Sequence, residues 1–407
     1  MKFLSLRFIA PLTVLLFAVF SGYLVYRSAW FSIAKHFSLL AQSFLHHHLY
    51  LNPINLPAGD YADYKARQYL FFGPMPSVLL TPFVAIWGES FPQIDLSIAS
   101  LVVVFSAIFL LARRFKFDTA DSFWLANFFV FGTVLYLVGL VNTSAYLVQA
   151  VGTVFVVLAI LEYFTKKRWF VMGILIGAAT ATRITLISAA FFFVLEIIRN
   201  RSSLNLRKAF VYFLVPVISS LILLGFYNYR RFGSVFDTGY TYNASALNKD
   251  YYNFKVGWFS PIHIPANLYV LLAMPPQPVK MGRVEFVLQF PYLKADKIGM
   301  AIWFTSPLFV FLFAARKKPY TFSALAAIFA ALVPSLLYWG IGIVQYGYRY
   351  SLDFLPFLFL ILLSAFREKL SGAAKLLIAG GIIFNCVYMA SLWGDYPLFR
   401  MFDYLFH

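Results

Sequence analysis

The sequence has few charged residues and almost no cysteine. Charged side chains make up 12% of the 407 residues, hydrophobic ones make up 61%, and acids are half as numerous as bases, 16 against 33. The mean hydropathy is +0.77, and such a composition excludes a soluble globular protein of this size. Cys386 is the only cysteine, so an internal disulfide is excluded as well.

The sequence also lacks the signatures of several enzyme classes. It contains no Walker phosphate-binding loop, no GxGxxG between a strand and a helix, no GxSxG and no HExxH. Nucleotide hydrolysis and hydrolysis by a serine or zinc enzyme are therefore not supported. Because no repeat, heptad or low-complexity linker divides the chain, we expect a single membrane domain over residues 1–407.

What the sequence has instead is a series of apolar runs that recur along its whole length. A helix needs about 20 apolar residues to cross a bilayer, and unbroken runs favour helices over barrel strands. We therefore predict an all-α polytopic membrane protein of about eleven spans. The predicted spans are 9–26, 94–112, 123–141, 148–164, 170–182, 186–198, 209–227, 299–314, 322–339, 352–366 and 374–392. We expect the first span to stay uncleaved, because no small-x-small site follows it.

The formal net charge of +17 comes largely from short connections between the spans. The basic residues concerned are Arg113, Arg114, Lys116, Lys166, Lys167, Arg168, Arg199, Arg201, Arg207, Lys208, Arg316, Lys317, Lys318, Arg367 and Lys369. Basic connections are typical of the cytoplasmic side, so topology explains the charge and no nucleic-acid partner is expected. The N-terminus is then cytoplasmic, and the long loops 28–92 and 228–297 are extracytoplasmic. Within the first loop, 31–45 and the proline-broken 71–87 are predicted to be interfacial helices.

Two acids stand close together in the first long loop. Asp60 and Asp63 lie three apart in GDYADYKARQY, and paired carboxylates can act as acid and base or bind a divalent cation such as Mg or Mn. Ordinary solvated loop acids are the alternative. Three consecutive histidines, 46–48, precede them, but adjacent helical residues point about 100° apart, so a chelating pair is not expected there.

Four arginines are placed at predicted outer span ends. Arg183 follows GILIGAATAT, Arg230 and Arg231 begin the second long loop, and Arg349 lies four residues before Asp353. Arginine binds phosphate in a bidentate fork, so each is a candidate for an anion site. The alternatives are snorkelling to headgroups, contact with outer-leaflet phosphates and, for Arg349, an i,i+4 ion pair with Asp353 on one helix face.

Taken in order, six stretches of the sequence resemble the GT-C superfamily of integral-membrane glycosyltransferases. They are LAQSFLHHHLYL (40–51), DYADYKARQYLFFGPMPSVLLTP (60–82), GILIGAATATR (173–183), NYRRFGSVFDTGY (228–240), KIGMAIWFTSPL (297–308) and GYRYSLDFLP (347–356). The resemblance extends to bacterial members related to protein O-mannosyltransferases, the lipid A aminoarabinose transferase and Rgt-type lipopolysaccharide transferases. It implies a prokaryotic plasma-membrane enzyme that transfers a hexose or pentose from a polyprenyl-phosphate donor to an extracytoplasmic glycan, lipid or protein.

The same resemblance implies roles for individual residues. The essential acid belongs to the first outer loop, which points to Asp60, with Asp63 beside it. The donor phosphate is expected at Arg349, Arg183, Arg230 and Arg231, with Asp353, Tyr69 and Tyr348 in supporting places. The sequence departs from the family in one respect, since many relatives carry an acid directly after the first span and SAWFSIAKHFSLLAQ has none. A polytopic transporter or lipid flippase, and a catalytically inactive scaffold, are the alternatives.

The predicted topology can be tested by cysteine labelling. We expect single cysteines at Ser90 and at Ser245 to react with a membrane-impermeant maleimide added to intact cells, because both lie in the two long outer loops. Protection of either position until the membrane is permeabilised would contradict the topology.

Overall fold

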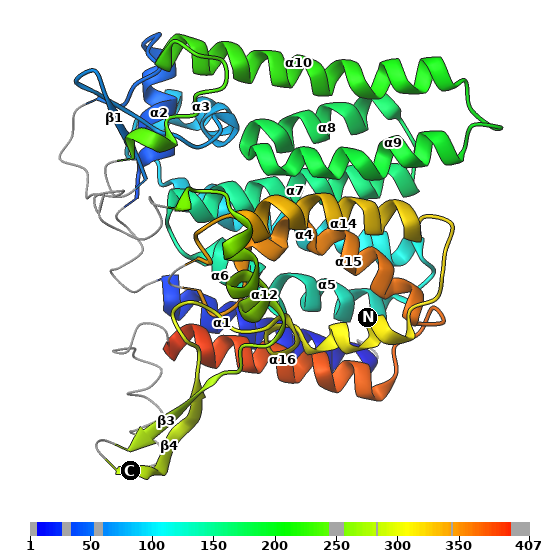
Figure 1. The fold of residues 1–407 in the computed structure, drawn as a ribbon. Helices are drawn as coiled ribbons and strands as arrows, with labels where there is room; N and C mark the ends of the chain where they lie inside the picture. The colour runs from blue at the N-terminus through cyan, green and yellow to red at the C-terminus, as the bar shows by residue number, and fades with distance from the viewer. Residues whose placement is uncertain are drawn as a thin grey trace.

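The structure is a computed structural model that describes residues 6–26, 34–52, 60–243, 256–281, 284–342 and 345–391. Most of these residues form helices packed side by side (Figure 1). The helices are α1 Leu6–Tyr26, α2 His36–Leu45, α3 Met75–Trp87, α4 Gln93–Arg114, α5 Thr119–Phe131, α6 Leu135–Leu140, α7 Ser144–Phe164, α8 Trp169–Thr182, α9 Ala190–Arg199, α10 Leu206–Phe232, α12 Ile264–Leu272, α13 Ile302–Thr305, α14 Thr321–Leu337, α15 Leu355–Leu362 and α16 Gly372–Ser391. The strands are β1 Ala62–Tyr64, β2 Arg67–Tyr69, β3 Gln277–Met281 and β4 Val284–Lys294, paired as two antiparallel hairpins.

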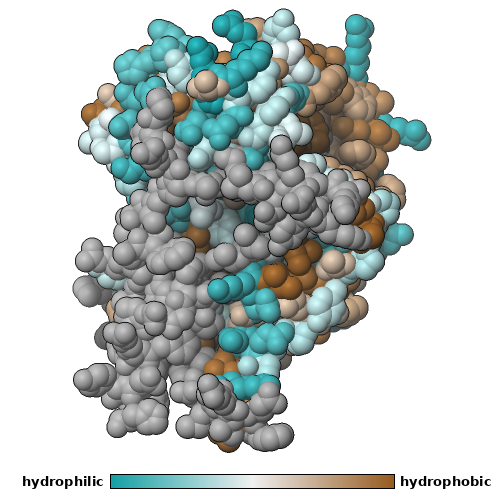
Figure 2. Space-filling view, turned by 60° about the vertical axis from the view of Figure 1, so that its left-hand side comes forward, coloured by the Kyte–Doolittle hydropathy of each residue, from teal (hydrophilic) through white to brown (hydrophobic). Residues whose placement is uncertain are grey.

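Four helices of the described chain are long and apolar enough to cross a bilayer. They are Gln93–Arg114, Ser144–Phe164, Leu206–Phe232 and Gly372–Met389. Along α10 the exposed side chains are large and apolar, and Ile222 and Leu223 are 66% and 67% exposed. Figure 2 shows apolar side chains gathered on one flank of the molecule, beside a more polar end. An apolar flank of this kind is the surface of an integral membrane protein.

Several of the predicted spans are not continuous helices. The span at 123–141 divides into α5 and α6, and the span at 186–198 begins as the 3₁₀ helix Ile184–Ala189. The span at 299–314 consists of the short α13 and the 3₁₀ helix Pro307–Ala314, since Pro307 has no N–H with which to continue α13. The count of eleven spanning helices is therefore not confirmed, although the fold is largely helical as predicted.

The two long loops meet at one end of the bundle (Figure 1, left). Ala62 of β1 forms a bridge with Asn243 in the second loop, and the rings of Phe71 and Tyr240 lie 4.5 Å apart. Ser245, which belongs to the labelling test, falls outside the described residues. Contact between the loops means that residues far apart in the sequence can build one site there.

The parallel helices α8 and α10 approach each other closely at their first halves. A Cβ on Gly173 would lie 2.4 Å from the carbonyl oxygen of Phe213, and one on Gly177 would lie 3.1 Å from that of Pro216. Ser220 Oγ donates a hydrogen bond of 2.7 Å to the carbonyl of Gly177. Two glycines four residues apart let membrane helices pack backbone to backbone. Beyond this contact α8 ends at Thr182, whereas α10 continues to Phe232.

We expect Gly173→Ala to destabilise the protein by about 1–3 kcal/mol, because the added methyl group would force the two backbones apart. Thermal unfolding in detergent measures the change. Gly380→Ala in α16 is the matched control, since nothing lies within 4 Å of its Cβ position, and it should leave the midpoint unchanged or raise it slightly. Equal midpoints for wild type and Gly173→Ala would show that the helix contact tolerates separation.

Candidate active site

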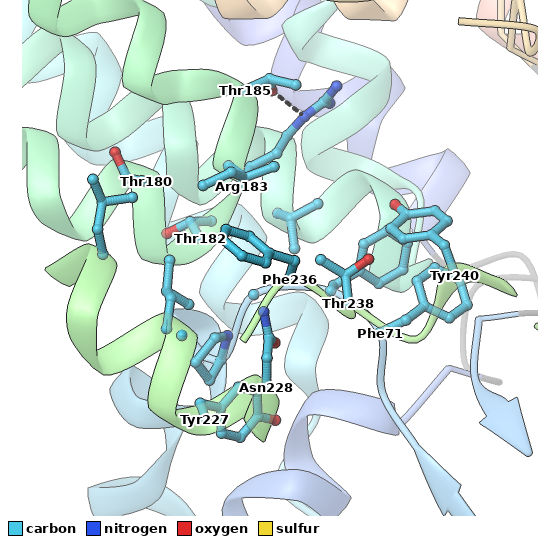
Figure 3. A pocket seen from close by; sticks show the side chains of 18 of the residues that line it. Phe71, Thr180, Thr182, Arg183, Thr185, Tyr227, Asn228, Phe236, Thr238 and Tyr240 are labelled. Atoms are coloured by element: carbon cyan, nitrogen blue, oxygen red, sulfur yellow. Dashed lines mark hydrogen bonds between the residues drawn. The ribbon is translucent and has the colours of Figure 1, made fainter. Parts of the chain in front are cut away.

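A large cavity lies where α8 ends and α10 continues. Its volume is about 1300 Å³. It is lined by segments from both long loops, the first turn of α7, the end of α8, α10, the end of α14 and the 3₁₀ helix Arg349–Asp353. Figure 3 shows side chains from these distant segments pointing into the same space. The cavity therefore lies between the two long loops and the helical bundle.

One wall of the cavity is apolar and belongs to α10. The lining residues there are Ile218, Leu221, Ile222, Leu224 and Phe226. Ile222 also belongs to the exposed apolar flank, so the cavity reaches the surface that faces lipid. A long hydrocarbon chain could lie along this wall without meeting a charge.

Two arginines from different segments meet on the opposite wall. Gln149 of α7, with its amide oxygen turned toward them, accepts hydrogen bonds from Nη1 of Arg183 at 2.7 Å and from Nη1 of Arg349 at 3.3 Å. The ring of Tyr350 lies beneath both guanidinium groups, at 5.3 Å and 4.6 Å. Tyr146 adds a second ring 5.3 Å from Arg349. Aromatic faces and an amide oxygen thus hold two cations next to each other.

Only one carboxylate is paired directly with these two arginines among the described residues. Asp353 Oδ2 lies 3.3 Å from Arg183 Nη2 and accepts a hydrogen bond of 2.7 Å from Thr185, which in turn accepts one of 3.0 Å from Arg183 Nε (Figure 3). Arg349 Nε is buried and has no partner among the described residues. The pair of guanidinium groups thus keeps donors and positive charge for an anion in the cavity.

The alternative for Arg349, an i,i+4 ion pair with Asp353, is not formed. These residues form a 3₁₀ helix, Arg349–Asp353, instead of an α-helix. With three residues per turn, positions four apart do not share a face. Asp353 instead pairs with Arg183 on another segment. Arg349 lies over the rings of Tyr146 and Tyr350.

Asp60 lies in the cavity at the N-terminus of α7. Its Oδ2 accepts a hydrogen bond of 3.4 Å from the N–H of Ala145, so the carboxylate meets the positive end of the helix dipole. Burial raises the pKa of Asp60 above its usual range, against the opposing influence of His36, the α7 amides and Arg349. Asp60 is partly buried and lines the cavity. A carboxylate of raised pKa in a cavity is suited to proton transfer.

Two predicted residues lie apart from the cavity. Asp63 lies opposite Gln68 in the β1–β2 hairpin. Because side chains alternate between the two faces of a strand, Asp63 is on the exposed face. It therefore does not share a site with Asp60. Arg230 is exposed on α10, over the ring of Phe226.

Arg231, Tyr69 and Tyr348 are buried and linked to neighbouring elements. Arg231 lines the cavity, donates a hydrogen bond of 2.6 Å to the carbonyl of Leu70, and lies 3.9 Å from the ring of Tyr227. The ring of Tyr69 lies 5.3 Å from that of Phe232. Tyr348 donates from its hydroxyl to Asn267 and to the carbonyl of Ser335. These contacts join the segments that surround the cavity.

Sequence reasoning missed Gln149, Tyr350 and Tyr240 as parts of the site. Gln149 is a polar residue in an otherwise apolar span, and that was the available signal. Tyr240 follows Gly239, whose φ of +89° suits glycine, and its ring packs on Phe71. Nothing local in the sequence links these positions.

The described residues do not offer a built site for a metal ion. No three His, Cys, Asp or Glu side chains among them could hold one together. His46 is hydrogen-bonded to Gln42 at 3.0 Å, and His48 stacks on Tyr50. The charged groups that influence Asp60 are a histidine and Arg349, which do not complete an oxygen-rich cation site. We assign no chemical step to Mg or Mn.

Comparison with protein families and with curated proteins finds no match. Among solved structures, the chain is similar to ArnT from Cupriavidus metallidurans bound to undecaprenyl phosphate, with a TM-score of 0.47, 13% identity, and coverage of 89% of this chain and 61% of that one. It is also similar to the archaeal oligosaccharyltransferase AglB from Archaeoglobus fulgidus in complex with an inhibitory peptide and a dolichol-phosphate, with a TM-score of 0.48 and 15% identity. There the coverage is 95% of this chain and 56% of that one. The chain thus spans less than two thirds of either structure.

The arrangement of the two arginines predicts the effect of removing their carboxylate. Asp353→Asn should destabilise the protein by about 3 kcal/mol, because it removes the buried carboxylate that is paired with Arg183. Thermal unfolding in detergent measures this change. Asp63→Asn is the exposed control and should leave the midpoint in place; equal stability of the two variants would mean that Asp353 does not neutralise the pair.

Proposed function

We propose that this chain is a membrane glycosyltransferase that moves a sugar from a polyprenyl-phosphate donor to an extracytoplasmic acceptor. One observation carries the proposal. A carboxylate, Asp60, and two adjacent guanidinium groups, Arg183 and Arg349, line the same cavity as the apolar wall of α10. These are the groups that a lipid-linked sugar phosphate requires, namely a wall for the chain, cations for the phosphate and a base for the reaction.

The donor would lie along the cavity with its hydrocarbon chain on α10. Its phosphate would then meet Arg183 and Arg349, which carry two positive charges against the single carboxylate of Asp353. Because a buried cation without an anion is unfavourable, a phosphate there would complete the charge balance. Arg231, the other predicted phosphate ligand in the cavity lining, also donates a hydrogen bond from Nη1 to the carbonyl of Leu70.

The reaction would proceed by attack of an acceptor hydroxyl on the anomeric carbon of the sugar. The new bond joins the acceptor oxygen to that carbon, the bond from the carbon to the phosphate oxygen breaks, and Asp60 takes the hydroxyl proton. The two guanidinium groups stabilise the charge that develops on the departing lipid phosphate. The α7 amides at Asp60 hold the carboxylate in place during this step.

The role of Arg349 predicts a specific failure of lysine. Arg349→Lys should weaken binding of undecaprenyl phosphate roughly tenfold or more, equivalent to about 1.5–3 kcal/mol, because an ammonium cannot reproduce the fork or its stacking on two tyrosine rings. Binding to purified protein in detergent measures it. Arg230→Lys, outside the cavity, is the control, and unchanged affinity in Arg349→Lys would assign Arg349 to structure alone.

The role of Asp60 predicts loss of transfer without loss of fold. Asp60→Asn keeps an acceptor for the α7 amide but cannot take a proton, so transfer of labelled sugar from polyprenyl phosphate should fall about 10²–10⁴-fold. Asp63→Asn should retain most of the activity. Undecaprenyl phosphate binding should persist in both variants.

The same assay separates the proposal from its alternatives. Full transfer by Asp60→Asn would remove Asp60 from catalysis. Wild-type protein that binds the lipid phosphate but transfers no sugar would instead favour a lipid carrier or an inactive scaffold, for which the arginine pair alone suffices.

A further inference from the structure

A buried histidine, His36, lies near Asp60 and is not among the residues that line the cavity. His36 begins α2 and is 6% exposed. Its Nδ1 lies 2.9 Å from Ser144 Oγ, and the next residue, Ala145, donates its N–H to Asp60. The first two residues of α7 therefore contact one side chain each, Ser144 the imidazole and Ala145 the carboxylate.

The second ring nitrogen of His36, Nε2, is buried and lacks a hydrogen bond to the described residues around it. A buried polar atom left without a partner is unfavourable in a purely structural residue. The ring of Tyr61, the neighbour of Asp60 in the sequence, lies 6.3 Å from the imidazole. The imidazole therefore lies near the first loop as well as α7.

We propose that His36 is a positioning residue that controls the protonation of Asp60, and thereby the pH range in which the proposed transfer operates. This inference rests on the proposed function for its last clause only. A positively charged imidazole beside the carboxylate favours the ionised form of Asp60, which is the form that can accept a proton. A neutral imidazole gives no such support.

Burial disfavours the charged form of both groups. Burial lowers the pKa of His36, and burial raises the pKa of Asp60, while each group opposes the shift of the other. The remaining titratable or charged groups near Asp60 are Arg349, Tyr146 and Tyr240. The tyrosines are neutral at physiological pH and the arginine keeps its charge. Among these described groups, His36 is therefore the one whose charge can change near Asp60.

The first test measures the protonation of Asp60 without requiring activity. Dicyclohexylcarbodiimide modifies protonated carboxyls in apolar surroundings, and mass spectrometry quantifies the modified Asp60 peptide across a pH series. In His36→Gln we expect the midpoint of labelling to move to higher pH by about one unit or more, because the nearby positive charge is lost. His46→Gln, an exposed histidine at the end of the same helix, should leave the midpoint in place.

A second variant, Ser144→Ala, provides an independent test if His36→Gln does not fold. Ser144→Ala keeps the imidazole but removes the hydroxyl that orients it, and should shift the midpoint in the same direction by a smaller amount. An unchanged midpoint in both folded variants, or an equal shift in His46→Gln, would overturn the proposal.

The second test uses transfer itself. In wild type the rate should fall as pH drops through the midpoint for Asp60, and in His36→Gln this acid limb should move to higher pH by the same amount as the labelling midpoint. A merely structural role would lower the rate at every pH and leave the limb where it is. If wild-type protein transfers no sugar at any pH, the proposed function fails, while the labelling profiles still decide the role of His36.

Discussion

Two guanidinium groups held side by side inside an apolar bundle are the constraint on which the site depends. Like charges repel and burial makes each one costly, so the surrounding residues must compensate. Asp353, Gln149 and the ring of Tyr350 do this together. Neither arginine lies within an α-helix, since Arg183 directly follows α8 and Arg349 begins a 3₁₀ helix. The breaks in the helices are thus part of the site.

Helix α7 supplies the fixed frame for both charges. Residues at its N-terminus form hydrogen bonds with Asp60 and His36 of the first loop. About one turn further on, Gln149 accepts hydrogen bonds from both arginines. The unpaired amides of a first helical turn attract a carboxylate, which fastens the loop to the bundle. A single central helix therefore sets the spacing between the candidate base and the candidate phosphate site.

The lipid-facing wall follows from unequal helix lengths. Glycines 173 and 177 bring α8 against α10 at one end, and α8 then stops while α10 continues. Past the end of α8, α10 presents apolar side chains to the cavity and to the exposed apolar flank. The cavity is the space that the shorter helix leaves open.

The sequence by itself determined that this is a helical membrane protein with two polar loops, because hydropathy and charge are local properties that need no partner. It also indicated Asp60, Arg183 and Arg349, since a charge in an apolar chain stands out. Only the tertiary structure decided which charges meet. Arg183 pairs with Asp353 across 170 positions, whereas Asp63 and Arg230, close in sequence to site residues, face elsewhere. Where the helices break and how the strands pair depend on packing between distant segments. No local sequence pattern shows that packing.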